Sequence, residues 1–370
     1  MINVLNIIDT GGPGGAETVF LQTATRLDPA RFRSAVVVGG TGWLADRLGQ
    51  TGVQPHIISS RGSFNFRYLA ALRRVARQSQ ADVVIAHLYG SAIYSSLLGL
   101  IHPLPVISVL HGQTDISQSG RLAGLKSAIV RKGSRRVVFV SKRLQDDLSS
   151  RLPLPPSRCL VIPNGVDTQI FRPCRDRSIR DELRLTENTV LVGAVGNVRQ
   201  PKAYDIFMRA AQILLAGSDR FHFVVAGESG GELGRELMEL CRTLGIERRA
   251  TFLGLRSDIA SVLNNLDVFV LSSKTEGFSI ACIEAMACGV PVVATRSGGP
   301  EEILQGDVGL LVPTGDPGAL ASAIEQVTSS KELAAGLAAR AMKRVNEEYS
   351  LAKMLARYED LVTSVVRGPR

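Results

Sequence analysis

The 370-residue sequence is poor in the features that mark secreted, metal-binding and membrane-spanning proteins. Its five cysteines form no CxxC pair and no cysteine–histidine spacing typical of a metal site: Cys159, Cys174, Cys241, Cys282 and Cys288. We therefore expect reduced thiols in a cytoplasmic protein. No apolar run of the sequence reaches the roughly 20 residues that span a bilayer. The first residues, MINVLNIID, lack the positive leader and long apolar core of a signal peptide, and they predict a strand.

The first glycine-rich stretch, residues 9–17, does not complete the G-x-G-x-x-G fingerprint of dinucleotide-binding proteins. After Gly12 and Gly14, the third glycine would fall on Glu17. This argues against a dinucleotide-dependent dehydrogenase. The sequence also has no Asp-x-Asp pair, no repeat of 20–50 residues and no low-complexity segment.

The composition is that of a globular protein with an uneven charge. Apolar residues make up 45% of the chain, and its length favours two or three domains. Residues 1–165 carry 19 Lys and Arg against 8 Asp and Glu, whereas the remainder carries 24 against 26. A basic first half favours an acidic partner such as nucleic acid, anionic lipid or a charged substrate. Solubility alone would explain it equally well.

Strand and helix patterns alternate along the chain. Strands are predicted at residues 2–8, 34–38, 83–86, 106–109, 137–140, 190–195, 221–226, 267–272 and 290–295. Helices are predicted at residues 18–27, 66–78, 91–100, 142–150, 280–287, 317–328 and 350–366. This rhythm predicts doubly wound parallel sheets. The net charge and the alternation of strands and helices both change at a Pro-Asn-Gly turn signal. We place the linker there, at residues 163–167.

Residues 267–295 predict a strand, a loop, a helix and a second strand. Ser279 is a plausible N-cap of the helix, and Gly289 can end it. Glu276 lies in the loop and Glu284 lies among small apolar residues of the helix. A glutamate in such surroundings is seldom buried without a partner. Because ligands of doubly wound sheets bind where strands end and helices begin, the two carboxylates favour a binding site over two solvated surface residues.

Three further segments at predicted strand ends are candidates for ligand contacts. Gly14 and Gly15 follow the first strand, and the Gly196–Lys202 loop carries basic groups that fit a diphosphate. His111 precedes a glycine at the end of the 106–109 strand. The other four histidines lack this context, although His87 also follows a strand.

The Glu-Gly-Phe-Ser segment at residues 276–279, followed by Glu284, resembles the signature of retaining glycosyltransferase family 4. The resemblance extends over nearly the whole chain and implies the α/β GT-B fold, in which two Rossmann-like doubly wound parallel-sheet domains face a central cleft. It implies an acceptor-side domain formed by residues 1–163, with a returning C-terminal helix from residues 350–370. Residues 164–349 would form the domain that binds the nucleotide-sugar donor.

The resemblance also implies roles for individual residues. The implied catalytic residues are His111, Lys202 and Glu276. The implied donor-binding residues are Gly14, Gly15, Asn197, Arg199, Leu255, Arg256, Gly277, Phe278, Ser279 and Glu284. Lys202 would neutralise the diphosphate, His111 and Glu276 would hold the sugar, and Glu284 would bind the ribose. Asn197 stands where the family has an arginine, so Arg199 could contact the phosphate instead, or Lys202, Asn197 and a helix N-terminus could suffice.

The implied reaction is transfer of a sugar from a nucleotide-diphosphate donor, with a UDP-sugar favoured, to a hydroxyl of a glycan or lipid-linked acceptor. Polysaccharide or glycoconjugate biosynthesis would be the context, with retention at the anomeric carbon. We expect no cofactor, no metal and no nucleic acid, and the missing Asp-x-Asp pair supports metal independence. The alternatives are a nucleotide-sugar epimerase or a phosphorylase on the same fold, and a non-catalytic nucleotide-sugar-binding protein.

One basic stretch raises the question of membrane attachment. Residues from Arg121 to Arg143 contain eight Lys and Arg with four interleaved apolar residues: Leu122, Leu125, Ile129 and Val130. A basic amphipathic helix of this kind can lie on an anionic membrane surface. It can equally be a solvated helix packed on its own domain. A cytoplasmic protein attached peripherally to the inner face of the membrane is therefore one of two interpretations.

Overall fold

The computed structural model describes residues 1–59, 65–112 and 122–368, which form two compact units. The N-terminal unit comprises Met1–Asn164 together with the chain from Ala352 onward, and the C-terminal unit is Gly165–Leu351. The sequence analysis placed these boundaries after residue 163 and before residue 350. The functions that it assigned to the two domains stay predictions.

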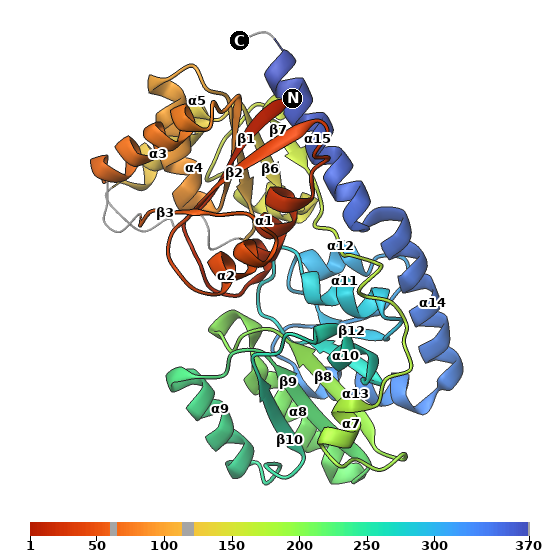
Figure 1. Ribbon diagram of the computed structural model, residues 1–370. Coiled ribbons are helices and arrows are strands. Elements are labelled where there is room, and N and C mark those ends of the chain that lie inside the picture. The colour runs from red at the N-terminus through yellow and green to blue at the C-terminus, as the bar shows by residue number, and fades with distance from the viewer. Residues whose placement is uncertain (60–64, 113–121, 369–370) are drawn as a thin grey trace. The chain divides into compact units, whose positions relative to one another are not determined.

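A seven-stranded parallel sheet forms the centre of the N-terminal unit, with strand order β3-β2-β1-β4-β5-β6-β7 (Figure 1). Its strands are β1 (Ile2–Ile8), β2 (Phe32–Val38), β3 (His56–Ile57), β4 (Val83–His87), β5 (Val106–Leu110), β6 (Arg136–Phe139) and β7 (Cys159–Val161). Its helices are α1 (Gly15–Arg26), α2 (Trp43–Gln50), α3 (Phe66–Gln78), α4 (Tyr89–Ile101), α5 (Ala123–Gly133), α6 (Lys142–Leu148) and α15 (Leu351–Arg367), with a 3-10 turn at Pro156–Arg158. Every residue of β4 and β5 is buried, as their apolar sequences require of central parallel strands.

A six-stranded parallel sheet forms the centre of the C-terminal unit, with strand order β10-β9-β8-β11-β12-β13. Its strands are β8 (Val190–Val195), β9 (Phe221–Ala226), β10 (Ala250–Gly254), β11 (Val268–Leu271), β12 (Val292–Thr295) and β13 (Leu310–Val312). Its helices are α7 (Ser178–Glu182), α8 (Tyr204–Gly217), α9 (Gly231–Thr243), α10 (Ile259–Asn264), α11 (Ile280–Ala287), α12 (Gly299–Ile303), α13 (Pro317–Ser329) and α14 (Lys331–Glu348), with a 3-10 turn at Gln200–Lys202. The sequence analysis did not predict α7, α8, α9, α10 and α14.

Each sheet has a topological switch point, where the strand order reverses. The first strand β1 lies between β2 and β4, and the first strand of the second sheet, β8, lies between β9 and β11. Loops leaving the two central strands at such a point diverge to opposite faces of the sheet and leave room for a ligand. The loops after β1 and β4, and those after β8 and β11, are therefore the places to look for a site.

The basic stretch at residues 121–143 is not one amphipathic helix, which corrects the sequence analysis. Helix α5 ends at Gly133, Ser134 is buried, and β6 then enters the sheet before α6 begins at Lys142. The apolar residues of β6 are buried in the central sheet, which a continued surface helix would not achieve. Arg121 lies outside the described residues. Among the described residues, none of the helices is both long enough and apolar enough to cross a bilayer.

The C-terminal helix α15 packs on the N-terminal unit, as the family resemblance implied. Its Glu359 carboxylate accepts a hydrogen bond from the Asp28 N–H (2.9 Å) and pairs with the Arg31 guanidinium (3.1 Å). Tyr358 and Val362 of the same helix are fully buried. The end of the chain thus completes the first core.

Candidate functional site

Helix α11 begins and ends where its sequence predicts. The Ser279 hydroxyl accepts a hydrogen bond from the Cys282 N–H (3.3 Å), so Ser279 is the N-cap. Gly289 follows the helix with φ +73°, a backbone conformation that favours glycine. The N-terminus of α11, with its positive dipole end, therefore lies at the carboxyl end of β11, beside the switch point of the C-terminal unit.

The loop before α11 is held in place by the segment that follows β12. The Glu276 N–H donates to the Ser297 carbonyl, and the Glu276 carbonyl accepts from the Gly299 N–H, both at 2.8 Å. A Cβ at Gly299 would lie only 2.6 Å from the Gly277 carbonyl oxygen, so this close approach requires glycine. The backbone of Glu276 and Gly277 is consequently fixed before any ligand arrives.

Lys202 and Glu276, which sequence analysis placed in two separate loops, meet at this switch point. The Lys202 ammonium lies 2.9 Å from Glu276 Oε2, and the Ser273 hydroxyl donates to the same oxygen at 3.0 Å. The two side chains are only 22% and 15% exposed, so water screens their attraction less than at an open surface.

Backbone contacts keep these two loops together. The Lys274 N–H donates to the Pro201 carbonyl (2.7 Å), and the Ser272 hydroxyl donates to the Lys202 carbonyl (2.9 Å). A cation that can neutralise a phosphate and an acceptor for sugar hydroxyls are thus positioned side by side.

Asn197, which stands where the family has an arginine, joins two loops. Its side-chain oxygen accepts a hydrogen bond from the Glu228 N–H (3.0 Å), and the Val198 N–H donates to the Glu228 carbonyl (2.8 Å). Next to it, Gly196 and Gly227 have φ +147° and +150° and lie so close that a Cβ at Gly227 would clash with the Gly196 carbonyl oxygen. Asn197 therefore braces the loop after β8 against the loop after β9.

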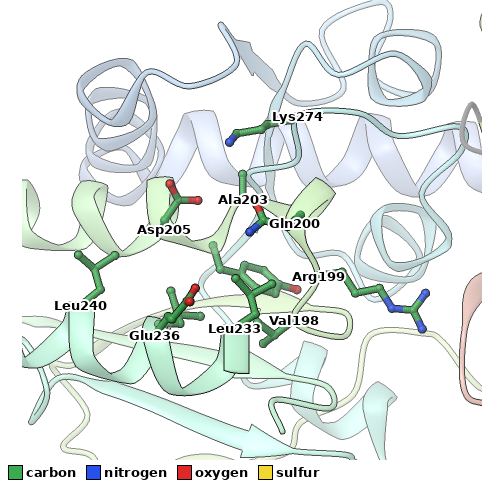
Figure 2. A pocket seen from close by; sticks show the side chains of 11 residues that line it. Val198, Arg199, Gln200, Ala203, Asp205, Leu233, Glu236, Leu240 and Lys274 are labelled. Atoms are coloured by element: carbon green, nitrogen blue, oxygen red, sulfur yellow. The ribbon is translucent and has the colours of Figure 1, made fainter. Parts of the chain in front are cut away.

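Arg199 lies on the exposed side of the same loop. It lines a cavity of about 240 Å³ formed mainly by the start of α8 and by α9, and Lys274 from the loop after β11 lines the same cavity (Figure 2). Figure 2 shows the Arg199 side chain extending away from Leu233 and Leu240. Its role as the replacement for the family arginine stays a prediction.

Leu255 and Arg256 follow β10, the edge strand on that side of the sheet. Leu255 is 57% exposed, so its side chain leaves an apolar surface that a flat ring could cover. The Arg256 guanidinium is bound by Asp258 (2.7 Å) and Glu182 (3.1 Å). Hydrogen bonds from Arg256 lower the pKa of Asp258. Since these partners occupy its charge, Arg256 can serve a ligand through its backbone.

Glu284 lies in the second turn of α11, partly shielded by its neighbours. Removal from water raises the pKa of Glu284 to about 7. The carboxyl group is therefore poised to lose its proton near neutral pH, and a ligand that binds the carboxylate would favour that ionisation.

His111 of the N-terminal unit follows β5 and contacts a second histidine. Its Nε2 lies 3.0 Å from His87 Nδ1, and the two rings are nearly parallel, with an interplanar angle of 22°. Removal from water lowers the pKa of His111 to about 3 and holds the pKa of His87 well below its usual value. Both rings are therefore neutral. The sequence analysis set His87 aside, although both residues end predicted strands.

Gly14 and Gly15 begin helix α1, with Gly14 as the N-cap residue. The Glu17 carboxylate folds back over Gly14, and the Thr10 hydroxyl donates to it at 2.7 Å. A diphosphate at this backbone would meet a negative charge and would have to displace it. The donor contact of these glycines stays a prediction.

Each half of the chain matches a glycosyltransferase family model, and two curated relatives are similar in sequence. Residues 13–170 match the model of Glycosyltransferase Family 4, and residues 189–330 match that of Glycosyl transferases group 1. N-acetyl-alpha-D-glucosaminyl L-malate synthase of Bacillus anthracis is 26% identical over 83% of this chain and 81% of its own length. D-inositol 3-phosphate glycosyltransferase of Rhodococcus opacus is 34% identical over 56% of this chain, and the match spans about half (50%) of that protein.

Solved structures resemble the whole chain. The Anabaena protein HepE, determined in complex with UDP-glucose, has a TM-score of 0.88 at 22% identity, and the match covers 98% of this chain and 100% of HepE. Sucrose-phosphate synthase from Thermosynechococcus elongatus has a TM-score of 0.83 at 18% identity, with 100% of both chains covered. Together with the two parallel sheets, this likeness confirms the predicted GT-B fold of two Rossmann-like domains.

Proposed function

Because the chain belongs to glycosyltransferase family 4, whose members transfer a sugar from a nucleotide-sugar donor, we propose that it is a retaining, metal-independent enzyme that uses a UDP-sugar. The observation that carries the proposal is the Lys202–Glu276 pair at the switch point of the C-terminal unit, 2.9 Å apart. The preference for UDP is supported by the structure of HepE with UDP-glucose. The acceptor is proposed to be a hydroxyl of a glycan or lipid-linked glycan.

In the proposed reaction, the bond from the anomeric carbon to the diphosphate breaks, and the acceptor oxygen bonds to the same carbon on the same face. The acceptor proton passes to a phosphate oxygen of the leaving group, so no protein base is required. The Lys202 ammonium neutralises the charge that develops on the diphosphate, and the N-terminus of α11 adds its dipole. Glu276 accepts hydrogen bonds from sugar hydroxyls, and Glu284 accepts them from the ribose.

The chain supplies the positive charge in this proposal, and no cofactor takes part. Over residues 1–59, 65–112 and 122–368 no three His, Cys, Asp or Glu side chains are grouped so that they could hold a metal ion. Activity that persists unchanged in excess EDTA would support metal independence, whereas activity restored only by a divalent cation would contradict it.

Membrane attachment is a further part of the proposal and rests on helix α5. Leu125 of this helix is 50% exposed, and the helix also carries three cations: Lys126, Arg131 and Lys132. Exposed apolar and basic groups on one short helix fit the surface of an anionic membrane. Sedimentation with anionic vesicles at low salt tests this, with Leu125→Glu as the variant. Equal sedimentation of the variant, or none of the wild type, would contradict it.

The decisive test of the reaction is incubation with UDP-, GDP- and ADP-sugars, with and without candidate glycan acceptors. The expected result is acceptor-dependent release of UDP and a product whose anomeric configuration, measured by NMR coupling constants, equals that of the donor. An inverted product would contradict retention. Interconversion of sugars without an acceptor would indicate an epimerase, phosphorolysis would indicate a phosphorylase, and binding without turnover would indicate a binding protein.

A further inference from the structure

A large cavity lies in the N-terminal unit, at the edge of the sheet opposite to the candidate residues described above. Its volume is about 710 Å³, and its walls come from the segments that precede β4, β5, β6 and β7 and from the end of α15. These strands are parallel, so their amino ends share one edge, whereas His87 and His111 follow the carboxyl ends at the other edge. The cavity is therefore separate from the residues to which the family resemblance gives a role.

The walls of this cavity are strongly basic. Its cationic lining residues are Lys132, Arg135, Arg136 and Arg158. Among the described residues that line it, Asp82 alone has a carboxylate, and that carboxylate accepts a hydrogen bond from the Asn3 N–H at 2.8 Å. Like charges that no anion balances repel each other, so an anion that entered the cavity would be bound favourably.

Close packing of two helix ends fixes the segment that carries most of these cations. A Cβ at Gly133, the last residue of α5, would clash with the Ser96 carbonyl group of α4, and a Cβ at Gly99 would lie 3.2 Å from the Gly133 carbonyl oxygen. The two glycines therefore allow the ends of α4 and α5 to approach closely. The next residue is fixed as well, because the Ser134 hydroxyl lies 2.8 Å from that of Ser96 and 2.7 Å from that of Ser108.

Two of the arginines are held by backbone carbonyls and keep an unbalanced charge. Arg136 Nη1 donates to the Arg135 carbonyl (3.1 Å), and Arg158 Nη1 donates to the Arg131 carbonyl in the last turn of α5 (2.9 Å). In the part of the chain that the structure describes, neither guanidinium forms an ion pair, and the Lys132 ammonium has no hydrogen-bond or ion-pair partner. Since a guanidinium has five N–H groups, each of these arginines retains donors for an oxyanion.

Part of this arrangement stabilises a helix end. Cations near the C-terminus of a helix interact favourably with its last carbonyl groups, and the hydrogen bond from Arg158 to Arg131 is of this kind. That role occupies one N–H group of Arg158 and needs no cavity. It does not explain why cations from the segments before β6 and before β7 line the same cavity, where their repulsion costs stability.

We propose that this cavity is a second anion site, which binds a phosphate monoester or a diphosphate through Lys132, Arg136 and Arg158. Guanidinium groups suit phosphate oxygens because two of their N–H groups can donate in parallel. Several cations together favour a group with more than one negative charge, as these phosphates have at neutral pH. The phosphate belongs either to a small soluble molecule or to a lipid headgroup. The site does not rest on the function proposed above, because its residues belong to the N-terminal unit alone.

The first experiment titrates inorganic pyrophosphate onto the full chain by calorimetry at low salt. Lys202→Met is the parent, because the proposed donor site would also bind a diphosphate. We expect the parent to bind pyrophosphate about tenfold or more weakly once Arg158→Gln or Lys132→Met is added. Arg33→Gln, which removes an exposed cation of β2 outside the cavity, should change the affinity less than about twofold. No binding by the parent, or equal effects of all three substitutions, would overturn the proposal. Lys132→Met removes no hydrogen bond, so it decides the question even if Arg158→Gln fails to fold.

The second experiment distinguishes the two sources of the phosphate. Wild type and Arg158→Gln are sedimented with phosphatidylcholine vesicles that contain or lack phosphatidic acid, with and without pyrophosphate. Sedimentation that requires phosphatidic acid, is lost in Arg158→Gln and is reduced by pyrophosphate would assign a lipid headgroup to the cavity. Binding of pyrophosphate without sedimentation would assign a soluble ligand. Sedimentation that neither Arg158→Gln nor pyrophosphate reduces would belong to another surface, such as that of Leu125, and would overturn the lipid as the occupant.

Discussion

At the switch point of the C-terminal unit an ion pair joins the loops after β8 and β11. In the N-terminal unit neutral groups meet beside the switch point, at the ends of β4 and β5. Lys202 and Glu276 form an ion pair at partial exposure, while His87 and His111 lie close together as uncharged rings. At the end of β1, removal from water raises the pKa of Asp9 and so favours its uncharged form. The same topology thus places an ion pair in one unit and uncharged rings in the other.

The difference has an explanation in local sequence. In the C-terminal unit Lys202 ends a 3-10 turn, and Glu276 forms a β-bridge with Gly298. Both side chains keep partial contact with water. In the N-terminal unit His87 is the last residue of a fully buried strand. A charge there would have to leave water entirely, so a neutral ring is the stable form.

Glu276→Ala should have the largest effect on activity. It removes the acceptor for sugar hydroxyls and leaves the Lys202 ammonium without its partner, so we expect kcat/KM to fall about 10²–10³-fold. Steady-state assays of UDP release measure it. The control is Ser273→Ala, which removes only the hydroxyl that donates to Glu276, and we expect a loss of roughly tenfold or less. Near-normal activity of Glu276→Ala would show that the ion pair is structural only.

Gly227→Ala should destabilise the charged site by about 1–3 kcal/mol, because its φ of +150° and the neighbouring Gly196 carbonyl leave no room for a Cβ. Urea denaturation measures the loss. Gly230→Ala is the matched control in the same loop, since φ there is −70° and a Cβ would meet nothing within 4 Å. If the two variants unfold at the same urea concentration, the close packing of the loops after β8 and β9 is not what holds the site.

The two units should respond to pH with opposite signs. A histidine with a lowered pKa binds its proton more readily in the unfolded chain, so the N-terminal unit loses stability as pH falls below about 6.5. Glu284 has a raised pKa of about 7, so the unfolded chain releases its proton first, and stability falls as pH rises from about 4.5 to 7.

Each of these groups contributes a slope of up to about 1.4 kcal/mol per pH unit. Denaturation curves between pH 5 and 7 should show that His87→Asn removes stability loss on the acid side, while Glu284→Gln removes the loss toward neutral pH. Changes of the same sign in both variants would contradict the contrast between the units.

Donor affinity should depend on the ionisation of Glu284. Binding that uses the carboxylate must first remove its proton, so affinity should fall by up to tenfold for each pH unit below 7. Titration calorimetry with the preferred nucleotide at pH 6, 7 and 8 measures this dependence. We expect weaker binding with a nearly flat pH profile for Glu284→Gln. A wild-type profile that is already flat would remove Glu284 from the ribose site.

Much of the fold could be predicted because its signals are local. Helix α11 and strand β8 have the predicted bounds, since an N-cap serine, a terminal glycine and short apolar runs mark their ends. The basic stretch was misinterpreted because the interpretation relied on the spacing of its charges and ignored the apolar residues within it. Those residues form strand β6 of the central sheet. Helices α8, α9 and α14 were among those missed, even though α14 has an N-cap, Ser330, whose hydroxyl accepts a hydrogen bond from the Leu333 N–H.

The rest of the site depends on which strands become neighbours. The meeting of Lys202 with Glu276 requires β8 beside β11, and the contact between His87 and His111 requires β4 beside β5. Asn197 could not be recognised as a brace, because its partner is the backbone of Glu228 after another strand. The family resemblance supplied the candidate residues. The pairing of strands brings Lys202 to Glu276 and His111 to His87.

Calorimetric titration of UDP onto the wild type, Lys202→Met and Arg199→Met tests whether the ion pair marks the nucleotide site. We expect the dissociation constant of UDP to rise at least tenfold in Lys202→Met, because the partly buried cation that we propose for the diphosphate is lost, and to change less than threefold in the exposed Arg199→Met. Unchanged UDP binding by Lys202→Met would contradict the assignment of the switch point between β8 and β11 as the donor site.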